Sequence, residues 1–166
     1  MAPIDIPVAT FEIKRTGVFD LDLLYKNMRK WFDDRGFVFQ ENVHKFKPPE
    51  LELEWEGTRK TTGYRKNIVE MKFHSWYHKE ITAKISGKEK KMVDARFQIK
   101  LSTKVVYDYK NKYDTPFKLW LQDFMHRFVL YYYAMIVWPD MAYYELVDLQ
   151  TKIKEWINTT IPGGAY

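Results

Sequence analysis

Residues 94–109 read DARFQIKLSTKVVYDY, and the predicted fold is built around this segment. Apolar and polar side chains alternate along it, as on a β-strand whose two faces meet different surroundings. One face carries Ala95, Phe97, Ile99, Leu101, Val105, Tyr107 and Tyr109, and the other carries Arg96, Gln98, Lys100, Ser102, Lys104 and Asp108. At about 3.3 Å per residue, such a strand is about 50 Å long. The pattern predicts an antiparallel sheet that is covered on one face only.

Shorter patterns of the same kind predict further strands around this one. The predicted strands span residues 8–14, 37–46, 51–56, 67–77, 79–86 and 94–109. A Pro-Pro pair separates residues 37–46 from residues 51–56, so we expect these two strands to form a hairpin. A turn is expected at residues 15–17, and a polar loop is expected at residues 57–63.

Two helical regions are predicted. Residues 20–35 have apolar side chains at three- and four-residue steps, with Asp near the start and Gly just past the end. A second helix is predicted over residues 117–138, because Thr115 and Pro116 are typical of a helix start. The Pro-Asp pair that follows breaks, kinks or recaps this helix, which then continues over residues 141–157.

The order of these elements indicates the fold class. Strand, helix, five strands and then helices predict an α+β fold, with a curved antiparallel sheet of about six strands packed on a long C-terminal helix. This order resembles that of helix-grip domains across most of the chain, although the second small helix that usually follows the first is missing. We expect one domain over residues 1–160 and a flexible tail at residues 161–166.

Composition excludes several classes of protein. The chain of 166 residues has no Cys, which excludes disulfides, a thiol nucleophile and thiolate metal sites. The longest apolar run, residues 128–138, is 11 residues long, whereas a membrane-spanning helix needs about 20. The first residues lack the basic and apolar regions of a signal peptide, so a cytoplasmic location is expected.

No catalytic signature or cofactor motif is present, so an enzyme is the less favoured class and no cofactor is predicted. On the strand assigned to them, His74 and His78 lie about 13 Å apart, too far to share a metal ion. Glu52, Glu54 and Glu56 project from one strand face at intervals of about 7 Å. Their similar solvation favours pairing with Lys or Arg on a neighbouring strand over acid–base catalysis.

Charge is unevenly distributed along the chain. Residues 57–112 contain 15 Lys and Arg against 5 Asp and Glu, and the remainder contains 12 against 17. The basic middle would suit a polyanion, or it would attract the acidic ends of another copy. Candidate nucleic-acid contacts on the charged sheet face are Lys72, Lys84, Arg96, Lys100 and Lys104. Acidic residues on the same face favour a salt-bridged, solvated surface over nucleic-acid binding.

Aromatic side chains are abundant, with 12 Tyr, 11 Phe and 6 Trp. Residues 128–138 are apolar on every side of a helix. Such a segment has to be enclosed by its own sheet, by a second subunit or by a membrane surface.

These aromatic residues lead to the main functional hypothesis. We expect a non-enzymatic binding domain with an apolar pocket between the sheet and the C-terminal helix, which takes an unidentified apolar small molecule. The predicted wall residues are Phe97, Ile99, Leu101, Phe124, Phe128, Tyr131, Tyr132 and Met135. The alternatives are a structural subunit of a homo-oligomer, joined through residues 128–138, and a nucleic-acid-binding module that uses the basic sheet face.

Overall fold

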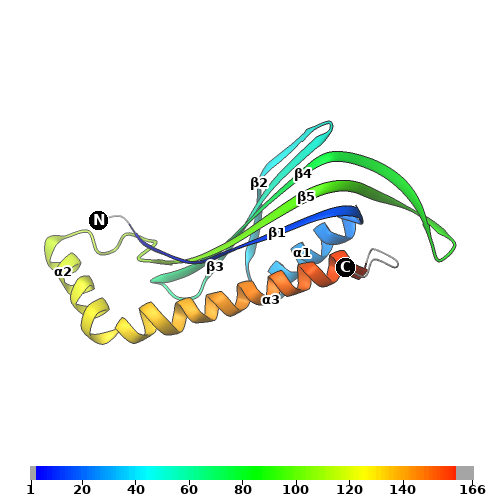
Figure 1. The fold of residues 1–166 in the computed structure, drawn as a ribbon. Coiled ribbons are helices and arrows are strands. Elements are labelled where there is room, and N and C mark those ends of the chain that lie inside the picture. The colour runs from blue at the N-terminus through cyan, green and yellow to red at the C-terminus, as the bar shows by residue number, and fades with distance from the viewer. Residues whose placement is uncertain (1–2, 160–166) are drawn as a thin grey trace.

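Five strands form one antiparallel sheet in the computed structural model, which describes residues 3–159 (Figure 1). In chain order the elements are β1 (Ile4–Phe19), α1 (Leu21–Asp34), β2 (Val38–Lys47), β3 (Glu50–Lys60), β4 (Arg65–Ile85), β5 (Lys88–Tyr107), α2 (Pro116–Phe124), the π-helical turns η1 (Met125–Val129) and η2 (Tyr133–Val137), and α3 (Trp138–Thr159). The strand order across the sheet is β1-β5-β4-β3-β2. The predicted α+β class, with a curved antiparallel sheet and a long C-terminal helix, is confirmed. The tail predicted at residues 161–166 lies outside the described residues.

The sheet has five strands rather than about six because the two strands predicted at residues 67–77 and 79–86 are one strand, β4. The pairing of β4 with β5 shifts register between Trp76 and Lys79, and Tyr77 adopts a φ of 57°. Both halves nevertheless stay paired with β5, because a bulge bends a strand without ending it. Beyond Val93, the last residue of β5 that also pairs with β1, β4 and β5 pair with each other alone and form a two-stranded arm (Figure 1).

One predicted turn is wrong and one predicted loop is shorter than expected, because a long partner strand extends the pairing. The turn expected at residues 15–17 lies within β1, where Gly17 pairs with Ala95 at a φ of 144°. The first residues of the loop expected at 57–63 likewise continue β3, which pairs with β4 as far as Lys60. Residues typical of turns are therefore held in strands here by their neighbours.

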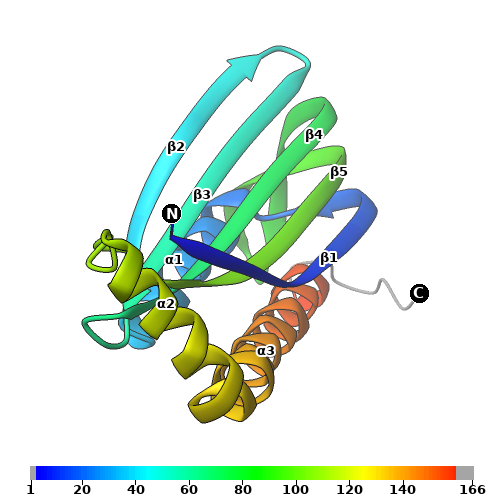
Figure 2. The same ribbon diagram turned by 90° about the vertical axis from the view of Figure 1, so that its left-hand side faces the viewer.

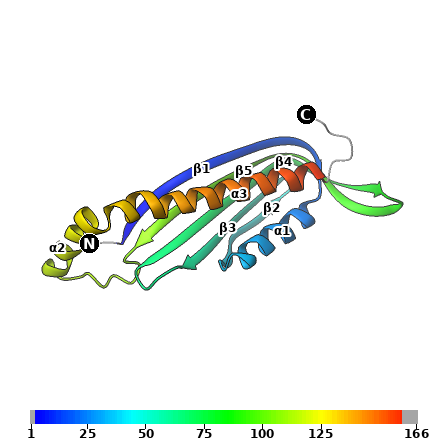
Figure 3. The ribbon, with the colours of Figure 1, turned by 90° about the horizontal axis from the view of Figure 1, so that it is seen from below.

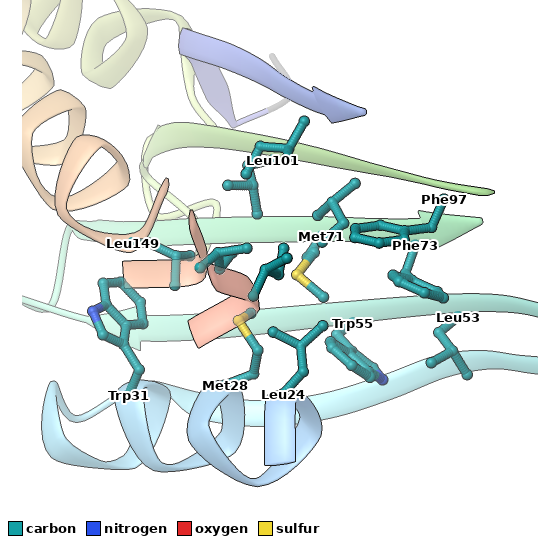
Figure 4. Packing of buried hydrophobic residues seen from close by; sticks show 14 of the residues in the cluster. Leu24, Met28, Trp31, Leu53, Trp55, Met71, Phe73, Phe97, Leu101 and Leu149 are labelled. Carbon is teal, nitrogen blue, oxygen red and sulfur yellow. The ribbon is translucent and has the colours of Figure 1, made fainter. Parts of the chain in front are cut away.

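The inner face of the sheet is covered by α1 and α3 (Figure 3). A close-up of this layer shows large side chains of α1 pointing toward those of β3, β4 and β5 (Figure 4). The buried cluster includes Leu24, Met28, Trp31 and Phe32 of α1, Leu146, Leu149, Ile153 and Ile157 of α3, and Trp55, Met71, Phe73, Phe97, Ile99 and Leu101 of the strands. Full burial of one such side chain contributes about 1.5–3 kcal/mol, so this layer supplies most of the stability.

The predicted ends of the first helix are confirmed. The Asp20 side chain accepts a hydrogen bond from the Leu23 N–H at 2.9 Å and caps α1. Gly36 follows the helix with a φ of 72°, a conformation that glycine adopts without strain. Local sequence is therefore sufficient to begin and end α1.

A polar junction attaches α3 to α1 and β3. Asp148 accepts hydrogen bonds from the Trp31 indole at 2.9 Å and from Arg35 at 2.5 Å, and Arg59 pairs with Glu145 at 2.7 Å. Partial burial alone would raise the pKa of Asp148, but the indole hydrogen bond and the Arg35 charge outweigh it and lower that pKa. These bonds fix the rotation of α3 about its own axis.

Replacement of Gly57 tests how tightly α1 packs on the sheet. A Cβ at Gly57 would lie 2.3 Å from a ring carbon of Phe32, too close for any side chain. We expect Gly57→Ala to lower the free energy of unfolding by about 1–3 kcal/mol in urea titrations. Gly63→Ala is the matched control, because nothing lies within 4 Å of its added Cβ. Equal stability of the two variants would contradict this packing.

Candidate functional site

The C-terminal helical region bends at Leu130, which separates α2 and η1 from the long helix that follows (Figure 2). Thr115 caps α2 and Pro116 is its first residue, as predicted. At the bend Leu130 has a φ of −102° and a ψ of 2°, and its N–H bonds to the carbonyl of Met125. The bend therefore precedes the Pro-Asp pair at which the sequence predicted it. Pro139 lies instead within the long helix, directly after the π-helical turn η2.

Polar bonds hold the inner side of α2 and the bend against the end of the sheet. The hydroxyl of Tyr64 lies 2.6 Å from His126 Nε2 and accepts a hydrogen bond from Gln122 at 2.9 Å. On β5, the Tyr107 hydroxyl donates to the carbonyl of Ala134 at 2.7 Å. Burial raises the pKa of Tyr107 to about 12, so this group remains a neutral donor. The residue that α2 buries is therefore polar, namely Gln122.

Exposed aromatic rings form a row along the other side of α2 and η1. Phe117, Trp120, Phe124 and Phe128 follow one another at steps of three and four residues, which places them on one helix face. Their consecutive ring centroids are 6.1, 5.7 and 5.1 Å apart. These side chains are 69%, 60%, 40% and 73% exposed. We call this row the aromatic ladder.

Exposed apolar side chains continue from the ladder past the bend and onto the first turns of α3. Together they form what we call the exposed aromatic surface: Phe117, Trp120, Phe124, Phe128, Val129, Tyr131, Tyr132, Tyr133, Met135, Ile136, Met141, Tyr143 and Tyr144. Elsewhere in residues 3–159, the large hydrophobic side chains that are exposed are Val38, Phe46 and Tyr77. Of the three enclosures considered for residues 128–138, burial by the chain's own sheet is therefore excluded for most of the segment.

Charges beside the ladder are paired with residues four positions away in the chain. Lys118 lies 2.9 Å from Asp114, and Arg127 lies 3.0 Å from Asp123. Residues 117–144 contain equal numbers of acidic and basic residues. The exposed aromatic surface therefore carries no net charge with His neutral.

The structure separates the eight residues predicted to line an apolar pocket. Phe97, Ile99 and Leu101 are at most 2% exposed and are packed in the core beneath α1 and α3 (Figure 4). The other five are exposed on α2 and the residues that follow it, namely Phe124, Phe128, Tyr131, Tyr132 and Met135. The two groups are not brought together around one cavity. The residues predicted from the sequence did not include Phe117 and Trp120, although their steps of three and four residues toward Phe124 place all three on one helix face.

The predicted nucleic-acid contacts lie at the outer face of the sheet and on the arm. Lys72, Arg96, Lys100 and Lys104 are on the outer face, and Lys84 is on the arm. Lys72 pairs with Glu54 at 3.1 Å, and Lys104 pairs with Glu70 at 3.3 Å. These ion pairs reduce the positive charge that phosphates would meet. The outer face is thus a surface of mixed charge.

Comparison of the chain with protein-family models, with curated proteins and with solved structures finds no match. None of the helices within residues 3–159 combines the length and the apolar composition that a membrane crossing requires.

The attachment of α2 is expected to depend on pH. Burial lowers the pKa of His126 below 6.5, and the nearby Asp123 opposes this shift only in part. Because the unfolded chain takes up the proton first, stability should be complete above about pH 6.5 and should fall as the pH drops below it. Thermal unfolding across this range measures the effect.

His126→Gln keeps an acceptor for the Tyr64 hydroxyl but does not titrate, so it should flatten the pH dependence. His44→Gln is the control, because His44 is an exposed histidine on β2, away from α2. A His126→Gln curve that runs parallel to that of the wild type would show that His126 does not control the attachment.

Proposed function

We propose that the chain is a structural subunit of a homo-oligomer, in which the exposed aromatic surface of one copy binds the same surface of a second copy. The observation that supports this proposal is the concentration of exposed large hydrophobic side chains between Phe117 and Tyr144. Monomeric proteins seldom expose a continuous apolar area of this kind, and areas of this kind mark interaction sites.

The chemistry of the surface suits a protein partner. Trp and Tyr are enriched among the residues that supply most of the binding energy in protein interfaces, and Trp120, Tyr131 and Tyr132 are each at least 56% exposed. Tyrosine rings bury apolar area while their hydroxyls remain at the wet rim. The bonds of Tyr64 to His126 and Gln122 hold the ladder in a fixed orientation, which lowers the entropic cost of association.

The charge pattern favours a second copy over a lipid surface. Helices that lie on anionic membranes have many Lys and Arg on their polar face, whereas α2 and η1 carry only Lys118 and Arg127, against Asp123. In a two-fold contact, residue i of one copy meets residue j of the other, and j meets i. With two ladders antiparallel about an axis near Met125, Asp123 of each copy would face Arg127 of its partner. The surface is self-complementary in this arrangement.

The other hypotheses have less support. An apolar pocket would need its eight wall residues to converge, and they lie in two separate groups. Nucleic-acid binding would use an outer face on which Lys72 and Lys104 are already paired. Both remain predictions, as does a cytoplasmic location.

The oligomeric state over a range of protein concentrations tests the proposal. By light scattering after size exclusion and by native mass spectrometry, the wild type should form a closed oligomer. The double variant Trp120→Ser/Phe128→Ser should raise the dissociation constant at least about tenfold. Val38→Ser is the matched control, because Val38 is 73% exposed on β2, outside the surface, and should leave association unchanged.

A wild type that stays monomeric at every concentration would overturn the proposal. If this monomer bound anionic lipid vesicles through Trp120 and Phe128, the surface would be assigned to a membrane instead. Because the ladder points away from the core, each variant should keep the wild-type fold. Circular dichroism of each variant checks that it does.

A further inference from the structure

Two glutamates and a histidine converge on the outer face of the sheet. Glu52 of β3 lies directly opposite His74 of β4 in the strand register, and Glu50 is two residues along the same strand face. His74 Nε2 is 3.6 Å from a Glu50 carboxylate oxygen and 3.9 Å from one of Glu52. One ligand atom from each residue lies within 4.8 Å of the other two. The register of β3 and β4 thus gathers one imidazole and two carboxylates.

These groups lack ordinary protein partners. His74 Nε2 has less than 1 Å² of accessible area and no hydrogen-bond partner, because both carboxylates lie beyond hydrogen-bonding distance. Within residues 3–159, no Lys or Arg lies within 4.0 Å of either Glu50 or Glu52, although Lys45 and Lys47 line a hollow beside them. Glu54, on the same face of β3, does pair with Lys72. A buried nitrogen without a partner is unfavourable, because it has lost its hydrogen bonds to water, so the arrangement calls for a further ligand.

We propose that Glu50, Glu52 and His74 bind a divalent transition-metal cation of the Zn²⁺ class. Bonds of about 2.0–2.2 Å in a tetrahedron place neighbouring ligand atoms about 3.3–3.6 Å apart, close to the 3.6 and 3.9 Å separations here. The two glutamates are 51% and 45% exposed and are free to close the remaining few tenths of an ångström. The imidazole nitrogen favours Zn²⁺ over Mg²⁺ or Ca²⁺.

The surroundings suit a site with three protein ligands and one open position. The His74 ring lies against the Trp76 ring, with centroids 4.1 Å apart, and this contact fixes the plane of the imidazole. A hollow of about 270 Å³, lined by Glu52, His74, Gln98 and Lys100 among others, leaves room for water as the fourth ligand. The site is separate from the exposed aromatic surface, so it does not depend on the proposed function.

Titration of the chelator-treated full chain with ZnCl₂ in a calorimeter tests the site. One equivalent should bind, and saturation should raise the melting temperature, because the ion binds the folded state. Glu52→Gln and His74→Ala should each weaken binding at least about tenfold, since even residues that only support a ligand contribute that much. MgCl₂ at the same concentration should not compete.

Two control variants separate this site from others on the surface. Glu54→Gln lies on the same strand face, and His44→Gln removes a histidine that pairs with Glu41 at 2.9 Å. Both should bind Zn²⁺ as the wild type does. The proposal is overturned if the wild type shows no saturable binding, or if His44→Gln abolishes binding while Glu52→Gln and His74→Ala retain it. Circular dichroism excludes loss of fold as the cause.

Discussion

Alternation along β4 and β5 makes one face of the sheet apolar, and that face has to be covered along strands that are longer than any helix of the fold. β4 has 21 residues and extends about 70 Å at 3.3 Å per residue. α3 has 22 residues but is only about 33 Å long, because a helix rises 1.5 Å per residue. One helix therefore covers about half of the strand length. This mismatch explains why the two ends of the sheet are built differently from its middle.

At one end, β4 and β5 leave the covered region as the arm, and the half-buried Ile81, Ala83 and Ile85 lie on one side of it. At the other end, a second small cluster forms where Tyr107 and Val105 meet the helix that leads into α3. The polar junction around Asp148 fixes the rotation of α3, so that Leu146, Leu149 and Ile153 point inward. The same rotation turns Met141 and Tyr144 outward, where they extend the exposed aromatic surface.

Patterns with a short period could be predicted from the sequence, and pairings between distant segments could not. The alternation in residues 94–109 and the capped helix at residues 20–35 depend on neighbours in the chain, and both elements are present, although β5 begins at Lys88 and ends at Tyr107. The bulge at Tyr77 looked like the end of a strand because nothing local reveals that β5 continues beside it. The cluster of Glu50, Glu52 and His74 arises from the register of β3 and β4, so the spacing of histidines along the chain gave no sign of it. The apolar composition of residues 128–138 likewise indicated that these side chains have to be buried, but it did not indicate whether the chain's own sheet, a second subunit or a membrane surface buries them.

The orientation of α2 is the strongest physical argument that the ladder has a partner. A helix that merely completes a fold turns its apolar side inward. In α2 the polarity is reversed: Gln122 is buried against Tyr64, while Phe117 and Trp120 are more than half exposed. Rotation of α2 by half a turn would bury these rings, at about 25 cal/mol for each Å² removed from water, but would break the bonds of Gln122 and His126 to Tyr64. The chain keeps its polar bonds inside and its rings outside, and burial of the rings gains further free energy when another surface covers them.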